Sequence, residues 1–170
     1  MEAVLLHAAG CLLGEGPMWH KERGSFFWVD IDGKAFYEYN FLTGDVKKRQ
    51  LNHRVSLVTK YKHFNDRLLL AVQGGLALYD LTTETFTWHA DIEKEILMHR
   101  TNDGAVDCNG NLWVGTMHRQ FVQGAGALRE GGDAVGPGGR RARPRAVRDA
   151  AEAAVVHRPH DLVLVVVVPH

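Results

Sequence analysis

Short apolar runs recur along the first part of the chain at nearly constant spacing. The repeated runs correspond in sequence pattern, and successive runs start 42 and 44 residues apart. They are Gly24–Asp30, Asp66–Val72 and Gly110–Thr116. Turn residues flank each run, and no long stretch has the 3.6-residue period of an amphipathic helix. A period of ~40 to 50 residues with about four strands per unit is typical of β-propeller blades. The repeat therefore predicts an all-β chain.

Turn signals place the other strands of each unit. Second strands are predicted over 33–39 and 74–80, and outer strands around Val46 and Phe86. Blades close into rings because each has a face that only a neighbouring blade can cover. At most three units can be counted, whereas a six-bladed ring would need roughly 250 residues at this period. We therefore expect a partial propeller of about three blades; an open stack of repeats is the alternative.

The N-terminal segment Val4–Leu13 is largely apolar and could be mistaken for a leader peptide. A signal peptide has a basic start and a continuous apolar stretch of ~7 to 15 residues, whereas here the early charge is Glu2 and His7 interrupts the run. We expect a first strand instead. The longest continuous apolar run, Leu162–Val168, is too short to span a bilayer. The sequence predicts a soluble protein.

Charge and cysteine content exclude several classes of partner. The 20 basic and 20 acidic side chains cancel, so no global field favours nucleic acid or an anionic membrane, and neither is expected as a partner. The two cysteines, Cys11 and Cys108, are isolated and form neither a metal-type pair nor a disulfide framework. Free thiols in a reducing, cytoplasmic compartment are the expectation.

Composition divides the chain into residues 1–128 and a tail, 129–170. All aromatic residues lie in the first part, and the tail uses only nine residue types. Gly131–Arg148 has too little apolar area to offset the entropy of ordering its backbone, so an irregular, disordered tail is expected. Ala150–Val156 could form a short helical turn. The valines at 165–168 have high β propensity and are an aggregation risk.

Those nine residue types are encoded largely by GC-rich codons, which motivates a hypothesis on the origin of the tail. It would be a shifted reading frame of a GC-rich gene, and the alternative is a natural disordered tail. Resequencing across codon 128 distinguishes the two, because an uninterrupted frame in an independent clone contradicts the frame shift.

Two motifs point beyond the fold. The first is Leu13–Trp19 (LGEGPMW), followed by Trp28–Ile31 (WVDI), and the second is Arg100–Met117 (RTNDGAVDCNGNLWVGTM). Together they resemble the family of regucalcin (senescence marker protein) and the gluconolactonases, over residues 1–128. The resemblance implies a six-bladed propeller that holds one divalent cation, calcium or zinc, at the mouth of its channel. It also implies hydrolysis of sugar lactones to aldonic acids.

The resemblance assigns Glu15 as a metal ligand and Arg100 and Asn102 as contacts to the sugar lactone. A carboxylate between two glycines is unobstructed by neighbouring side chains, which suits a ligand. An Arg fork and an Asn amide offer several donors and an acceptor to a polyhydroxylated ring. Without the motifs, Glu15 would be taken as a solvated turn residue, Asn102 as a turn asparagine and Arg100 as a surface arginine.

Other residues of the motifs are interpreted as structural. Asp103 and Gly104 are expected to form a turn pair, and Asp107–Gly110 a hairpin turn. Trp19, Trp28 and Trp113 are expected in the core. His118 lies close enough in sequence to reach the channel mouth but is favoured as an ordinary histidine, as are His157 and His160 of the tail.

The sequence also departs from the family. The metal site of the family takes two further ligands, an asparagine in an Asn-Gly-Leu stretch and an aspartate in a Pro-Asp-Gly stretch, and neither stretch occurs here. That aspartate is also the expected general base, so the catalytic residues are unknown. We expect weak or no binding of the cation by this chain and impaired lactonase activity. The alternative is a non-catalytic propeller fragment or binding module that lacks a complete metal site. In either case the chain is expected to self-associate through open blade edges.

Overall fold

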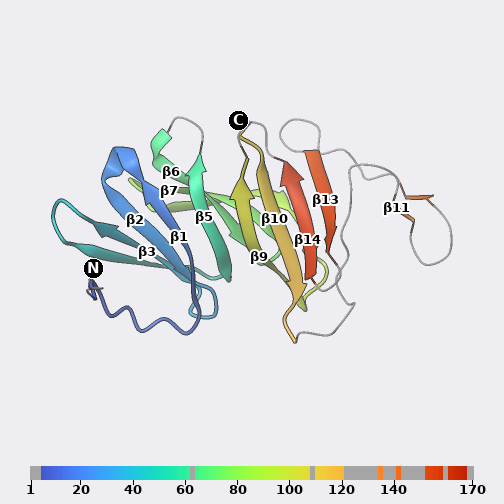
Figure 1. Ribbon diagram of the computed structural model, residues 1–170, viewed down its shortest axis with the longest axis horizontal. Helices are drawn as coiled ribbons and strands as arrows, with labels where there is room; N and C mark the ends of the chain where they lie inside the picture. Colours follow the sequence, from blue (N-terminus) through green and yellow to red (C-terminus); the bar gives the residue numbers. More distant parts are fainter. Residues whose placement is uncertain are drawn as a thin grey trace.

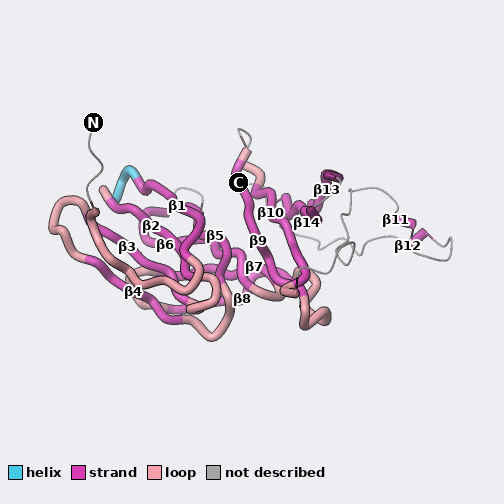
Figure 2. Tube along the Cα trace, turned by 60° about the horizontal axis from the view of Figure 1, so that its bottom comes forward, coloured by secondary structure: helices cyan, strands magenta, loops and turns pink. Residues whose placement is uncertain are grey.

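The computed structural model describes residues 5–61, 64–107 and 110–120, and the backbone of four strands between residues 134 and 167. The described part is all-β, with several antiparallel sheets and no α-helix (Figure 1). The first sheet has the order β1-β2-β3-β4. Its strands are β1 (Gly14–His20), β2 (Ser25–Asp30), β3 (Ala35–Asn40) and β4 (Val46–Gln50). A short 3₁₀ turn, η1 (Lys21–Arg23), joins β1 to β2 (Figure 2).

The second sheet repeats this order as β5-β6-β7-β8, and β9 pairs with β10 in a third. The strands are β5 (Val55–Tyr61), β6 (Phe64–Val72), β7 (Gly75–Asp80), β8 (Thr85–Asp91), β9 (His99–Val106) and β10 (Leu112–His118). The predicted second strands and outer strands are therefore confirmed. Three successive units, of which two have four strands, agree with the propeller blades predicted from the repeat.

Four further strands lie in the tail: β11 (Ala134–Val135), β12 (Arg141–Ala142), β13 (Glu152–Arg158) and β14 (Asp161–Val167). The hairpin β13–β14 lies beside the third sheet, with β14 next to β10 (Figure 1). A helical turn at Ala150–Val156 was therefore a wrong prediction, because residues 152–158 are extended; their valines favour strand over helix. Most of Gly131–Arg148 lies outside the described residues.

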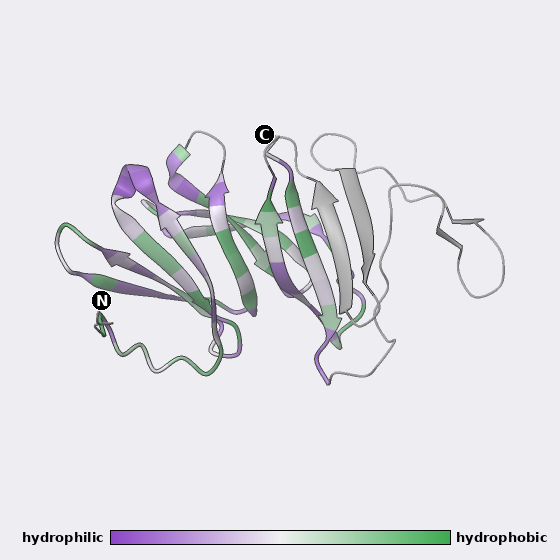
Figure 3. Cartoon of the chain, viewed as in Figure 1, coloured by the Kyte–Doolittle hydropathy of each residue, from purple (hydrophilic) through white to green (hydrophobic). Residues whose placement is uncertain are grey.

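The main core lies between the first two sheets. Apolar side chains of β2 and β3 pack against those of β5, β6 and β7 (Phe27, Val29, Phe36, Val58, Leu68, Leu70, Val72, Ala77). The other face of the second sheet packs toward the third sheet, where Leu112 and Val114 are buried. Strand β5 is accordingly hydrophobic over its first half and becomes hydrophilic toward its end (Figure 3). Each sheet thus covers a face of its neighbour, as blades do.

A buried ion pair crosses the first sheet. Glu38 on β3 accepts hydrogen bonds from Arg49 Nη2 at 2.9 Å and from Arg23 Nε at 3.1 Å. The side chains of Glu38 and Arg49 are 8% and 4% exposed. Burial alone would raise the pKa of Glu38, but the two arginines outweigh burial and lower that pKa below its ordinary value. The carboxylate is therefore ionised in the folded protein at neutral pH.

The first strand begins later than predicted. Residues 5–13 are irregular, and β1 starts at Gly14. Leu5, Leu6 and Leu12 are exposed by 79%, 62% and 77%, so this segment does not bury a strand face. The motif residue Asp30 holds its end instead, because the carboxylate accepts the backbone N–H groups of Leu12 and Leu13.

Two further expectations were wrong. None of the three tryptophans expected in the core belongs to it: Trp19 is 50% exposed and packs edge to face against Phe41, and Trp28 and Trp113 are half-buried outside both core clusters. Asp103 and Gly104 do not form a turn but lie within β9, at an irregularity of its pairing with β10. The turn at Asp107–Gly110 is confirmed at its ends by the hydrogen bond from Gly110 N–H to the Asp107 carbonyl oxygen. Within the described residues, no helix is long and apolar enough to cross a bilayer.

Candidate functional site

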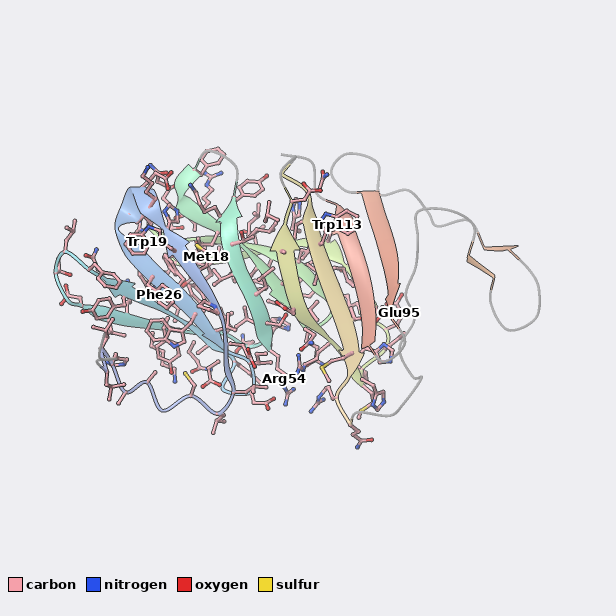
Figure 4. The ribbon with its side chains drawn as sticks, viewed as in Figure 1. Met18, Trp19, Phe26, Arg54, Glu95 and Trp113 are labelled. Carbon is pink, nitrogen blue, oxygen red and sulfur yellow. The ribbon has the colours of Figure 1, made fainter. Side chains whose placement is uncertain are left out.

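The first strands of the three successive sheets, β1, β5 and β9, lie next to one another. They carry the two motifs and the segment between them, so residues far apart in sequence meet along one surface. Met18 lies between β1 and β5 (Figure 4). Arg54 stands at the lower end of the same view, where β5 begins.

Glu15 occupies an irregular position near the start of β1. It pairs with Val29, and the register shifts between Glu15 and Met18. Gly16 has a positive φ of 60°, and a Cβ there would lie 3.4 Å from the carbonyl oxygen of Ser56. The left-handed backbone conformation therefore favours glycine at this position, whereas a Cβ would meet β5 only at an ordinary contact distance. The bulge leaves the Glu15 side chain exposed.

Asp30 anchors the strand that carries Glu15. Its carboxylate accepts N–H groups from both sides of the β1–β2 ladder, those of Leu13 and Gly33 at 3.0 Å each. Burial alone would raise the pKa of Asp30, but these backbone donors, with that of Leu12, lower it below its ordinary value. Asp30 thus has a structural role: its carboxylate binds the backbone N–H of Leu13, which lies two residues before Glu15.

Arg100 and Asn102, the predicted substrate contacts, are joined directly. Arg100 Nη1 donates hydrogen bonds of 2.9 Å to the Thr101 carbonyl oxygen and to Asn102 Oδ1. Arg100 is 8% exposed, whereas Asn102 is exposed. Burial lowers the pKa of Arg100, and nearby Asp32 partly opposes this effect; an arginine nonetheless stays protonated. The surface-arginine interpretation of Arg100 is therefore wrong.

A cavity of about 380 Å³ brings the two motifs together. Glu15, Gly16 and Pro17 line it from the first motif, and Asn102 and Asp103 from the second; Ile31 and Ser56 complete the lining. Arg100 reaches this cavity through Asn102. The sequence predicted Glu15 and Asn102 as site residues but missed Asp103, because its Asp-Gly context was interpreted as a turn. The bulge that places Asp103 here depends on the pairing partner and has no local signal.

The sequence also missed Arg54 and Asp32. Arg54 Nε donates to Asp32 Oδ1 at 2.9 Å, and Arg54 Nη1 donates to Gln73 Oε1 at 3.3 Å. Asp32 lies between β2 and β3, so this pair links the first two sheets beside Arg100. His118 is half-buried on β10 and does not line the cavity. The side chains of His157 and His160 lie outside the described residues.

The oxygen atoms of the cavity do not form a complete cation site. Among the described residues, no three His, Cys, Asp or Glu side chains converge as metal ligands would. Calcium takes roughly six to eight oxygen ligands, and zinc usually takes three or four protein ligands. Glu15 supplies one carboxylate, and Asp103 Oδ1 accepts the Gly104 N–H at 2.7 Å. The residues that line this cavity therefore do not complete a cation site by themselves.

Comparison with known proteins identifies relatives of this chain. Residues 13–133 match the sequence model of the SMP-30/Gluconolactonase/LRE-like region. Regucalcin of Oryctolagus cuniculus is 32% identical over 63% of this chain and 35% of its own length. The L-arabinolactonase of Azospirillum brasilense is 30% identical over 67% of this chain and 37% of its own length. The chain thus spans less than half the length of each of these relatives.

Solved structures with a similar fold also include a regucalcin. The crystal structure of a calcium-binding protein, regucalcin, from Agrobacterium tumefaciens superposes with a TM-score of 0.64 and 33% identity. The match covers 68% of this chain and 38% of that protein. A luciferin-regenerating enzyme shares the fold, with a TM-score of 0.62 over 69% of this chain. The fold expected from the repeat is therefore shared with regucalcin-like propellers.

Proposed function

This chain belongs to the SMP-30/gluconolactonase/LRE-like family, and we propose that its cavity binds a sugar lactone for hydrolysis to the aldonic acid. Lactonases are among its relatives. The observation that carries the proposal is the hydrogen bond from Arg100 to Asn102 at the edge of a cavity that Glu15 also lines. The domain carrying this function would be residues 1–128, with 129–170 as a separate tail.

The Arg100–Asn102 contact orients the amide for a lactone. Because Asn102 Oδ1 accepts from Arg100 Nη1, the Nδ2 group of Asn102 is left to donate into the cavity. A lactone presents a carbonyl oxygen, a ring oxygen and hydroxyl oxygens, all of which accept such a donor. The burial of Arg100 removes competing water and strengthens hydrogen bonds around the guanidinium. These residues would thus position the ring carbonyl, which is the usual contribution of substrate contacts to rate.

A divalent cation, calcium or zinc, would polarise the lactone carbonyl when bound in the longer proteins of the family. In this chain Glu15 is the residue proposed as its ligand, by position in the motif. Since the described residues do not complete the cation site, we assign them no cation-dependent step.

A second candidate function is a non-catalytic lactone-binding module. The incomplete cation site among the described residues favours it for this chain. The two functions differ in turnover, because a module binds an aldonolactone without accelerating its opening. Opening releases a proton, so the rate can be followed with a pH indicator, with and without added calcium or zinc and against the spontaneous reaction. A rate above the spontaneous one that depends on Glu15 would favour the enzyme.

The binding proposal can be tested with an aldonolactone and ligand-observed NMR on the 170-residue chain. Asn102→Ala removes the proposed donor from an exposed position, so the fold should persist while the affinity for the lactone falls by up to about tenfold, as expected for losing one neutral hydrogen bond. The control is Asn65→Ala, which changes an exposed asparagine on β6, at the far end of the β5–β6 hairpin. If both variants lose lactone binding equally, or if neither loses it, Asn102 is not the specific substrate contact.

A further inference from the structure

His99 and His118 face each other across the β9–β10 ladder. They are direct partners in the pairing, and their ring centroids are 5.6 Å apart with the rings at 84°. Opposite residues on an antiparallel ladder have Cβ atoms about 5 Å apart on the same face, so the two imidazoles reach a common volume. His99 is buried and His118 is half-buried.

A carboxylate supports the buried histidine. Glu93 Oε2 lies 2.9 Å from His99 Nδ1, and the two side chains are 13% and 8% exposed. The chain holds Glu93 in the left-handed region, with φ of 48°, and its carbonyl oxygen accepts the Ile96 N–H at 2.9 Å. When the neutral ring donates Nδ1–H to the carboxylate, its lone pair is on Nε2. In many proteins a metal-binding histidine likewise donates its other ring N–H to a carboxylate, which orients the ring.

The second histidine also offers a lone pair. His118 Nδ1 accepts the Gln120 N–H at 3.2 Å in an exposed setting, so this nitrogen is unprotonated when the bond is made. A metal ion could replace such a long, solvated hydrogen bond at little cost. The rings meet edge to face, and a turn of the less buried ring, that of His118, would direct both lone pairs to one ion.

We propose that His99 and His118 form a two-histidine site for a transition-metal ion such as Zn²⁺, Cu²⁺ or Ni²⁺, with Glu93 orienting His99. Imidazole nitrogen suits these ions, whereas calcium takes oxygen ligands. The site is therefore separate in chemistry from the Glu15 cavity. Water would complete the coordination sphere, because the described side chains supply no third converging His, Cys, Asp or Glu.

Isothermal titration of the 170-residue chain with zinc chloride tests the proposal. One equivalent should bind, and His118→Ala should abolish that site. Glu93→Gln should weaken binding by about 10- to 100-fold, as loss of an orienting carboxylate does. Zinc should also raise the melting temperature of the parent chain but not of His118→Ala, and calcium should do neither through this site.

Two controls separate this site from adventitious binding by other histidines. His7→Ala removes an exposed histidine of the N-terminal segment, and the double variant His157→Ala with His160→Ala removes the closely spaced pair of the tail. Neither should change the zinc isotherm. Zinc binding that survives His118→Ala, or that is lost with the tail histidines, overturns the proposal. If His118→Ala does not fold, His118→Gln decides, because it keeps a polar side chain but no imidazole.

Discussion

Ser56 Oγ donates a 2.8 Å hydrogen bond to Thr101 Oγ1, and both side chains are buried. The bond joins the first strand of the second sheet to the first strand of the third, beside the Arg100–Asn102 pair. It is thus a direct polar link between two blades at the level of the proposed substrate contacts.

Ser56→Ala should loosen this link. The Thr101 hydroxyl would lose its donor in a buried setting, and such a loss costs about 1 to 3 kcal/mol. We expect the free energy of unfolding in urea to fall by that amount. The aldonolactone signal should weaken as well, because Asn102 follows Thr101 directly. A double-mutant cycle with Thr101→Val checks the pairing: additive effects of the two changes would show that the hydroxyls act independently.

The buried pair of Glu38 and Arg49 makes stability sensitive to acid. The pKa of Glu38 is lowered in the folded protein, as a net effect of burial opposed by Arg23 and Arg49. A carboxyl group with a lowered folded-state pKa contributes stability above its unfolded pKa, and loses it as pH falls toward the folded pKa. Stability should therefore decline as pH drops below the ordinary glutamate value of 4.5.

Glu38→Gln should remove this dependence and cost about 3 kcal/mol at neutral pH, because it leaves Arg49 buried beside a neutral partner. Arg49 Nε and Nη1 already lack hydrogen-bond partners among the described atoms, and Glu84 Oε1 contacts Arg49 Nε only at 4.0 Å, so little compensates for the lost charge. Urea denaturation at pH 7 and at pH 3.5 measures both effects. Glu95→Gln, at an exposed glutamate outside the ion pairs of the first sheet, is the control and should change neither. If Glu38→Gln loses as much stability between pH 7 and pH 3.5 as the parent chain does, Glu38 is not the group that causes the acid sensitivity.

Sequence alone located the blades because their pattern is local. The strands around Trp28, Leu69 and Trp113 combine β-branched and aromatic residues with flanking turns, and each was found within a few residues of its observed bounds. The start of β1 was missed because Leu5 and Leu6 have strand-like composition but no neighbour to cover them. Burial depends on tertiary partners, which a periodic pattern does not contain.

The site was predictable only in part, for a similar reason. Glu15 and Asn102 each belong to a recognisable sequence motif, and both line the same cavity. Asp103 depends on a bulge, and the His99–His118 contact depends on the register of β9 against β10. Neither a bulge nor a register can be read from one strand, since both are set by pairing between two.

Calcium should bind weakly or not at all at Glu15 in the 170-residue chain. The described residues offer too few oxygens for calcium, as argued above. Isothermal titration with calcium should show no stoichiometric site, and Glu15→Gln should leave the isotherm unchanged. A single site of micromolar affinity that disappears in Glu15→Gln would mean that residues outside the described part complete the coordination.

The outer face of the first sheet should cause self-association. Trp19 and Phe41 are exposed by 50% and 51% and pack edge to face 5.4 Å apart, beside a largely apolar hollow of about 330 Å³. Exposed contiguous apolar surface of this kind drives association. The 170-residue chain should therefore elute from size-exclusion chromatography mainly as oligomers, and the double change Trp19→Ser with Phe41→Ser should shift it toward monomer. Phe64→Ser, at an aromatic residue that is 42% exposed on β6, should not. A parent chain that is a monodisperse monomer melting cooperatively above about 50 °C would show that this face is covered in another way.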